Sequence, residues 1–137
     1  MVKLIEKIEL KKAGLLYIFM SLITIIVHLS VIFQLMPYTW INGGRSATYE
    51  VARQTSIHSI PYFVIMFPIS LIACGIIRVK WNNVGKKMFS IFLWMIVAYT
   101  CLGLIMQLLG TTFEKSVMSV VCAVSVIMGF RLAIEKR

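Results

Sequence analysis

Four long apolar stretches constrain the fold of this chain more than any other feature, and none has a charged residue in its interior. They cover about residues 13–36, 57–77, 88–109 and 116–132. About 20 consecutive apolar residues in a helix span the hydrocarbon core of a bilayer, where a helix satisfies its own backbone hydrogen bonds. The sequence therefore predicts an all-α integral membrane protein, a four-transmembrane-helix bundle that forms a single domain over residues 1–137.

The distribution of charge agrees with a membrane protein. Only 14% of the residues are charged, against about 25% in a typical soluble domain. The net charge of +9 does not indicate a nucleic-acid partner, because the basic residues flank the apolar stretches. Most of them lie at the two chain ends and in the second connection: Lys3, Lys7, Lys11, Lys12, Arg78, Lys80, Lys86, Lys87, Arg131, Lys136 and Arg137. The first and third connections hold Arg45, Arg53 and Lys115.

This asymmetry predicts an orientation. Short loops rich in Lys and Arg stay in the cytoplasm, so we expect a multi-pass protein of the cell membrane with both termini cytoplasmic. The loops around residues 37–56 and 110–115 are then expected to face outward. The absence of Asp and the frequent Ile, Met and Lys are typical of an AT-rich bacterial genome.

Polar residues recur at helical spacing within the apolar stretches. In a membrane, such residues mark the faces that pack against other helices. The first stretch has a polar face made of Tyr17, Ser21, Thr24 and His28, and the third has one made of Thr100, Gly103 and Gln107. These faces are predicted to meet inside a compact bundle.

His28 is the one ionisable side chain predicted to lie deep in the membrane. Such residues are rare and often functional, yet a neutral His can also hydrogen-bond a neighbouring Ser, Thr or carbonyl. A structural, a proton- or ligand-binding, and a metal-binding role are all open. Cys74, Cys101 and Cys122 form no C-x-x-C pair and are expected to be buried as small hydrophobic residues. No metal site and no cofactor are predicted.

The first outer connection has the most varied chemistry in the chain. Pro37 ends the first apolar stretch, and Asn42-Gly43-Gly44 predicts a turn, because these residues tolerate a positive φ. Ser46 or Thr48 can cap a helix that continues into the second span. The sequence thus predicts a short helical or turn-rich outer loop between the first two spans.

Several polar side chains of this loop are expected to gather near the outer membrane surface. Glu50, Gln54 and His58 follow an i, i+4, i+8 pattern, and Arg53 is placed to pair with Glu50. A Gly-Gly-Arg turn offers backbone N–H groups beside a guanidinium, which suits a phosphate or a carboxylate. The candidate ligand-binding residues are Gln34, Trp40, Asn42, Arg45, Glu50, Arg53, Gln54, His58 and Gln107. The alternative is a well-capped loop in which these residues only stabilise the helix start.

Three functions fit these residues. The first is a binding or accessory protein that recognises a lipid, a peptide or a membrane-protein partner through the outer loop 37–58. The second is a subunit of an oligomeric small-molecule or ion transporter, which predicts a homo-oligomer. The third is a lipid-modifying enzyme with Glu50 and His58 as acid and base. No nucleophile or metal set completes that pair, so the sequence favours binding over catalysis.

Overall fold

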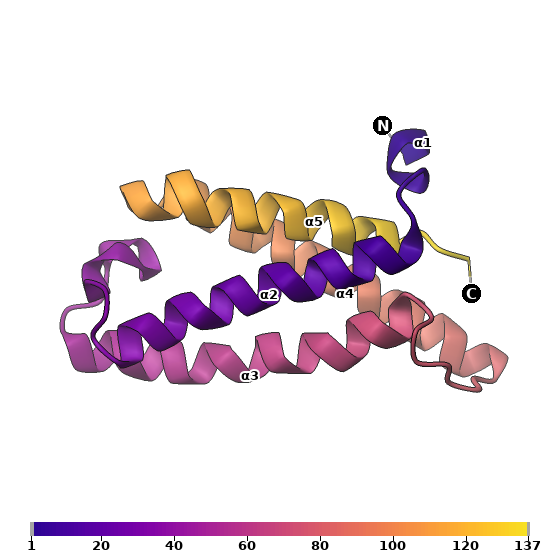
Figure 1. Cartoon of the computed structure of the whole chain (residues 1–137), viewed down its shortest axis with the longest axis horizontal. Helices are drawn as coiled ribbons and strands as arrows, with labels where there is room; N and C mark the ends of the chain where they lie inside the picture. Colours follow the sequence, from indigo (N-terminus) through magenta and orange to yellow (C-terminus); the bar gives the residue numbers. More distant parts are fainter. Residues whose placement is uncertain (1, 137) are drawn as a thin grey trace.

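A computed structural model describes residues 2–136 and is all-helical over that range, with no strand. Met1 and Arg137 lie outside the described residues. The charge of Arg137, which counted toward the predicted orientation, therefore lies outside them as well. Four helical segments are long and apolar enough to cross a membrane (Figure 1). They are α2 (Leu10–Ile32), α3 (Tyr49–Ala73), α4 (Asn83–Leu108), and the π-helical turn η3 (Glu114–Met118) continued by α5 (Ser119–Ala133).

These helices run side by side, with their connections at two opposite ends. Both chain ends, the short helix α1 (Val2–Glu6) and the connection 74–82 lie at one end, which we call the terminal end (Figure 1). The connections 33–48 and 109–113 lie at the other, which we call the loop end. The expected four-helix class is confirmed.

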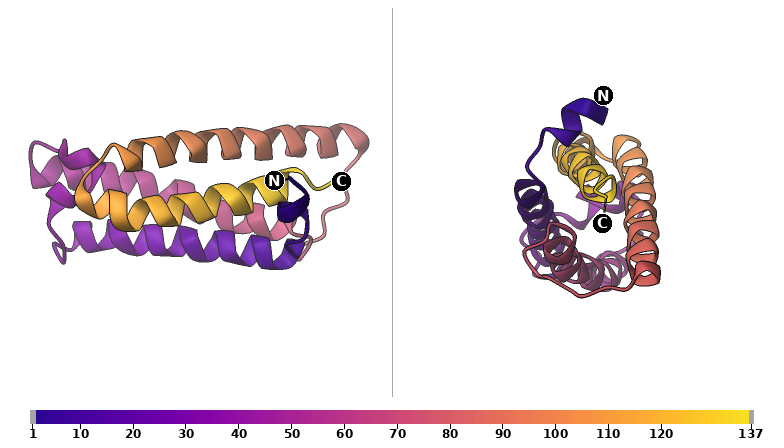
Figure 2. Two further views of the ribbon diagram at one scale, coloured as in Figure 1. Left: turned by 90° about the horizontal axis from the view of Figure 1, so that it is seen from above. Right: turned by 90° about the vertical axis from the view of Figure 1, so that its right-hand side faces the viewer.

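The four helices do not pack equally on one another. Helix α2 packs against α3 and α5, and α4 packs against α5, whereas α3 and α4 make little contact with each other. The end-on view in Figure 2 shows the resulting order α3, α2, α5, α4 around the bundle axis. The expected compact bundle is therefore open along one side, between α3 and α4.

The main apolar core fills the terminal half of the bundle. Its buried residues come from all four long helices and include Ala13, Ala73, Cys74, Leu93, Val97, Met128 and Leu132. Close approach of α2 and α3 depends on Gly14, because a Cβ atom there would lie only 2.5 Å from the Cβ of Cys74. Small residues permit such approach between helices.

Helix α3 begins well before the apolar stretch that predicted it. Thr48 caps the helix, its side-chain oxygen accepting a hydrogen bond from the N–H of Val51 at 3.4 Å. The helix then continues without a break through Pro61 and Pro68. The polar segment that follows Thr48 and the second apolar stretch thus form one continuous helix.

The loop between α2 and α3 contains two short helical turns, η1 (Tyr38–Trp40) and η2 (Asn42–Gly44). Asn42, Gly43 and Gly44 all have left-handed backbones, with φ of 56°, 67° and 67°. This confirms the turn with positive φ that the sequence predicted. The hydroxyl of Tyr49, at the start of α3, donates to the carbonyl of Ile32, at the end of α2, at 2.5 Å. This hydrogen bond links the two ends of the loop.

At the terminal end, one arginine joins the N-terminal segment to the end of α5. Arg131 is 8% exposed. Its side chain donates from Nε to the carbonyl of Ile8 at 2.8 Å and forms an ion pair with Glu135 at 2.8 Å. Arg131 therefore has a structural role in addition to its contribution to the charge of this end.

Candidate functional site

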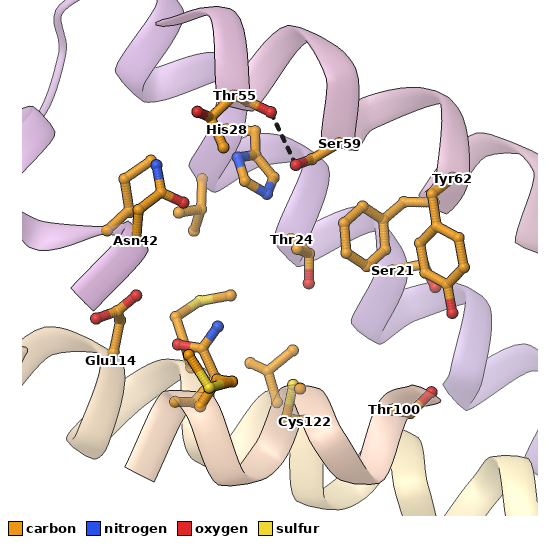
Figure 3. Close-up of a pocket in the computed structure, with 18 of the residues that line it drawn as sticks. Ser21, Thr24, His28, Asn42, Thr55, Ser59, Tyr62, Thr100, Glu114 and Cys122 are labelled. Carbon is orange, nitrogen blue, oxygen red and sulfur yellow. Dashed lines mark hydrogen bonds between the residues drawn. The ribbon is translucent and has the colours of Figure 1, made fainter. Parts of the chain in front are cut away.

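A cavity of about 930 Å³ lies between the helices in the loop half of the molecule. Along α2 its wall runs from Tyr17 to His28, which is about 16 Å at about 1.5 Å per residue. Figure 3 shows Glu114 and Asn42 at one end of the cavity, and Tyr62 and Thr100 at the other. The volume is that of a small-molecule site, since such sites span about 300–1,000 Å³.

Each long helix contributes polar side chains to the wall. From α2 come Tyr17, Ser21, Thr24 and His28, which is the whole face that the sequence predicted to point inward. From α3 come Glu50, Gln54, Thr55, His58, Ser59 and Tyr62; from α4, Thr100 and Gln107; and from η3 and α5, Glu114, Cys122 and Ser125. Apart from Asn42 of the loop, the remaining wall is apolar and aromatic, and includes Phe63, Tyr99, Leu102 and Met106.

The loop end of the cavity is closed by a contact between the two loops. The buried carboxylate of Glu114 accepts the N–H of Gly43 on both oxygens at 3.0 Å, and the N–H of Thr111 at 2.8 Å. The hydroxyl of Thr111 donates to the carbonyl of Trp40 at 2.5 Å, and the Trp40 ring stacks on Phe113. The loop 37–45 is thereby fastened to the start of η3.

This contact changes the role expected of the Gly-Gly-Arg turn. In the sequence its N–H groups, beside the guanidinium, were candidates for binding an external phosphate or carboxylate, with a well-capped loop as the alternative. In the structure, the N–H of Gly43 instead donates a hydrogen bond to the carboxylate of Glu114. The exposed Arg45 does not line the cavity, and no ion pair of Arg45 occurs among the described residues.

His28 faces the cavity and is held by the neighbouring helix. Its Nδ1 lies 3.1 Å from the hydroxyl of Ser56, a fully buried residue of α3. This is the Ser contact that a structural role for His28 predicts. Among the described residues, no three His, Cys, Asp or Glu side chains gather as a metal site.

The polar stripe predicted on α3 forms one side of the cavity. Glu50 accepts a hydrogen bond from Gln54 at 3.0 Å and pairs with Arg53 at 3.4 Å. His58 hydrogen-bonds the carbonyl of Gln54 at 2.7 Å. Gln54 and His58 remain exposed, because α4 does not cover this face of α3.

Aromatic rings make the contact between α3 and α4 at the inner end of the cavity. The ring of Tyr62 lies 5.1 Å from the ring of Tyr99 and 5.1 Å from the ring of Phe63, centroid to centroid. The hydroxyl oxygen of Tyr62 is buried near the hydroxyls of Tyr17 and Thr100. Below this group the apolar core of the terminal half begins.

The structure brings together part of the predicted site. His28, Asn42, Glu50, Gln54, His58 and Gln107 all line the cavity. Gln34, Trp40, Arg45 and Arg53 do not. Gln34 sits in a left-handed turn after α2, with φ of 58°, and is exposed. Trp40 and Arg53 act on cavity residues indirectly, through the loop contact and through Glu50.

Sequence reasoning missed the importance of Glu114 and of Tyr62. Glu114 lies just before the fourth apolar stretch, and no role was predicted for it. One signal was present: it is a lone acidic residue at the start of an apolar helix, where burial of a carboxylate needs donors from elsewhere in the chain. Tyr62 offered no comparable signal, because an aromatic residue in an apolar helix is common.

Comparison of the chain with protein-family models, with curated proteins and with solved structures finds no match.

Proposed function

We propose that this chain is a multi-pass protein of the cell membrane that binds a lipid or another small amphipathic ligand in the cavity. In the proposed orientation both termini are cytoplasmic and the loop end faces outward, as the distribution of Lys and Arg favours. The single observation that carries the proposal is the cavity of about 930 Å³, with polar groups from every long helix.

The open side of the bundle supports a ligand that comes from the bilayer. Gln54 and His58 are exposed on the face of α3 that α4 leaves uncovered. Polar residues at membrane depth face the protein interior or a water-filled cavity, because contact with lipid tails is costly. An amphipathic molecule between α3 and α4 would cover these groups and place its apolar part beside Leu102 and Met106, which are both exposed.

Binding fits this arrangement better than catalysis. Glu50 and His58, the candidate acid and base, are each engaged with their own helix. Among the nucleophile types in the wall, the hydroxyls of Thr55 and Ser59 donate to carbonyls of α3 itself. Cys122 lies on α5, at the opposite side of the cavity (Figure 3). These engagements favour a binding role for the wall.

Native mass spectrometry of protein gently extracted from its membrane tests the proposal. Gly103 lines the cavity, and the nearest atom to a Cβ placed there is the Sγ of Cys122 at 4.0 Å. Gly103→Leu should therefore fill part of the cavity. Ala98→Leu is the matched control, since Ala98 is exposed on α4 outside the cavity.

We expect the wild type and Ala98→Leu to retain a bound lipid or other small molecule that Gly103→Leu loses. A chain that carries no bound molecule in any of the three forms, or one that Gly103→Leu retains undiminished, would contradict the proposal.

Transport by an oligomer is the second candidate, favoured by the same cavity at the loop end. A path through the chain would need the apolar core of the terminal half to open. This function predicts flux in liposomes that His28→Ala reduces, together with a stable homo-oligomer. A monomer without flux would exclude it.

A further inference from the structure

The charge of the cavity wall selects among amphipathic ligands. Two carboxylates, those of Glu50 and Glu114, line it. Among the described residues no Lys or Arg does so. An anionic headgroup would thus meet negative charge with no Lys or Arg in the wall to pair with it, whereas a cationic one would meet complementary charge.

The two carboxylates differ in how far they are already paired. Glu50 is ion-paired with Arg53 at the rim. Glu114 is 4% exposed, and no Lys, Arg or His forms an ion pair with it among the described residues. Its three hydrogen bonds come from the neutral backbone N–H groups of Gly43 and Thr111. Buried charges in proteins are normally paired with an opposite charge.

A second acceptor at the same corner of the cavity lacks a donor. The side-chain oxygen of Gln107 is buried and has no hydrogen-bond partner among the described residues. Gln107 lies in the last turn of α4, and the connection 109–113 leads from there to Glu114. A ligand group that both carries positive charge and donates several hydrogen bonds would satisfy both residues.

From these observations, and resting on the function proposed above, we propose that the cavity binds an amphipathic primary amine. Its ammonium group lies between Glu114 and Gln107. Its apolar chain lies along the wall toward Tyr62, Phe63 and Tyr99. An ammonium has three donors and no acceptor, which matches a corner that offers acceptors. A quaternary ammonium has the charge but no donor, and a phosphate-bearing lipid amine adds an anion that the wall does not pair.

Probes with one twelve-carbon chain and different headgroups test this proposal in a non-ionic detergent, with binding followed by native mass spectrometry. The probes are dodecylamine, dodecyltrimethylammonium, dodecanol and dodecanoate, with a single-chain phosphatidylethanolamine to represent a lipid headgroup amine. We expect dodecylamine to bind at least about tenfold more tightly than dodecanol. Dodecyltrimethylammonium and the phosphatidylethanolamine should bind less tightly than dodecylamine, and dodecanoate least.

Variants test whether the ammonium lies beside Glu114. Glu114→Gln has nearly the same shape and keeps an acceptor for the loop, so its main change is the loss of charge. It should lower dodecylamine affinity to that of dodecanol and leave dodecanol unchanged. The control Glu9→Gln removes an exposed carboxylate that pairs with Lys12, outside the cavity, and should change neither. If Glu114→Gln does not fold, Gln107→Leu should weaken dodecylamine more than dodecanol.

The possible results distinguish failure of this inference from failure of the proposed binding function on which it rests. Equal binding of amine, alcohol and carboxylate that Gly103→Leu abolishes would overturn the ammonium site and leave the binding function intact. Tighter binding of the phosphatidylethanolamine than of dodecylamine would overturn the free amine in favour of a lipid headgroup. Binding of none of these probes by the wild type would count against both proposals.

Discussion

Glu114 joins two connections that are 71 residues apart in the chain. Its buried carboxylate fixes the left-handed turn at Gly43 over one end of the cavity and also holds the N–H of Thr111 at the start of its own helix. This side chain therefore holds the loop in position relative to η3, together with the hydrogen bond from Thr111 to Trp40 and the stacking of Trp40 on Phe113. The position of Asn42 in the cavity wall follows from it.

Loss of this carboxylate should release the loop without unfolding the bundle. Hydrogen bonds to a charged group contribute about 1.5–3 kcal/mol each. In Glu114→Ala we therefore expect amide hydrogen exchange at Gly43 and Thr111 to accelerate by about 10- to 100-fold, because about 1.4 kcal/mol corresponds to a factor of ten. Exchange within α2 and α3 should stay unchanged.

Glu50→Ala is the matched control for this experiment. Glu50 is also a carboxylate at the loop end, but among the described residues it hydrogen-bonds only with the side chains of Arg53 and Gln54, and it is exposed. Its removal should leave exchange at Gly43 as in the wild type. Equal acceleration in both variants would show that Glu114 has no special role in holding the loop.

At the scale of helices, the distances between neighbouring helices determine where the cavity can form. Gly14 allows α2 and α3 to meet at the terminal end. At the loop end, His28 and Ser56 hydrogen-bond across the same pair. Helix α4 packs on α5 and leaves α3 uncovered, apart from the aromatic contact of Tyr62 with Tyr99.

A methyl group at position 14 should force α2 and α3 apart. A Cβ there would lie 2.5 Å from the Cβ and 2.7 Å from the Sγ of Cys74. Overpacking of this kind costs about 1–3 kcal/mol, so Gly14→Ala should lower the thermal unfolding midpoint measured in mild detergent. Gly103→Ala, whose added Cβ would lie at an ordinary contact distance of 4.0 Å from the Sγ of Cys122, should leave the midpoint unchanged or raise it. Identical shifts in both variants would contradict the close approach.

Helical periodicity predicted the inward faces of the helices but not the way the helices pair. Tyr17, Ser21, Thr24 and His28 share a face because a helix repeats every 3.6 residues, which is a local property of the chain. The separation of α3 from α4 depends on side chains of all four helices at once. The bond between Glu114 and Gly43 likewise joins distant segments, and no local pattern signals it.

At the scale of the whole molecule, the distribution of charge and the position of the cavity together predict which side of the membrane the ligand site faces. The connection 74–82 and both chain ends, which hold most of the Lys and Arg, share the terminal end (Figure 1). The cavity lies in the other half, next to the loops. In the proposed orientation the ligand site is therefore near the outer surface of the membrane.

Cysteine labelling in intact cells tests this orientation. Thr112 is exposed at the loop end and Lys86 is exposed near the terminal end. A membrane-impermeant maleimide should label Thr112→Cys in intact cells and Lys86→Cys only after permeabilisation, above the background of the three native cysteines. The opposite pattern would mean that the chain is inserted the other way round.

The most direct test of the central claim is to map where an apolar ligand contacts the protein in a bilayer. A single-chain amphiphile with a diazirine at the end of its chain would be photo-crosslinked to the embedded protein, and the labelled positions identified by peptide mass spectrometry. We predict that the crosslinks concentrate at Tyr62 and Phe63 on α3 and at Tyr99, Leu102 and Met106 on α4, and that Gly103→Leu reduces them while Ala98→Leu does not. Crosslinks spread evenly over the outward faces of all four helices, unchanged by Gly103→Leu, would contradict the account.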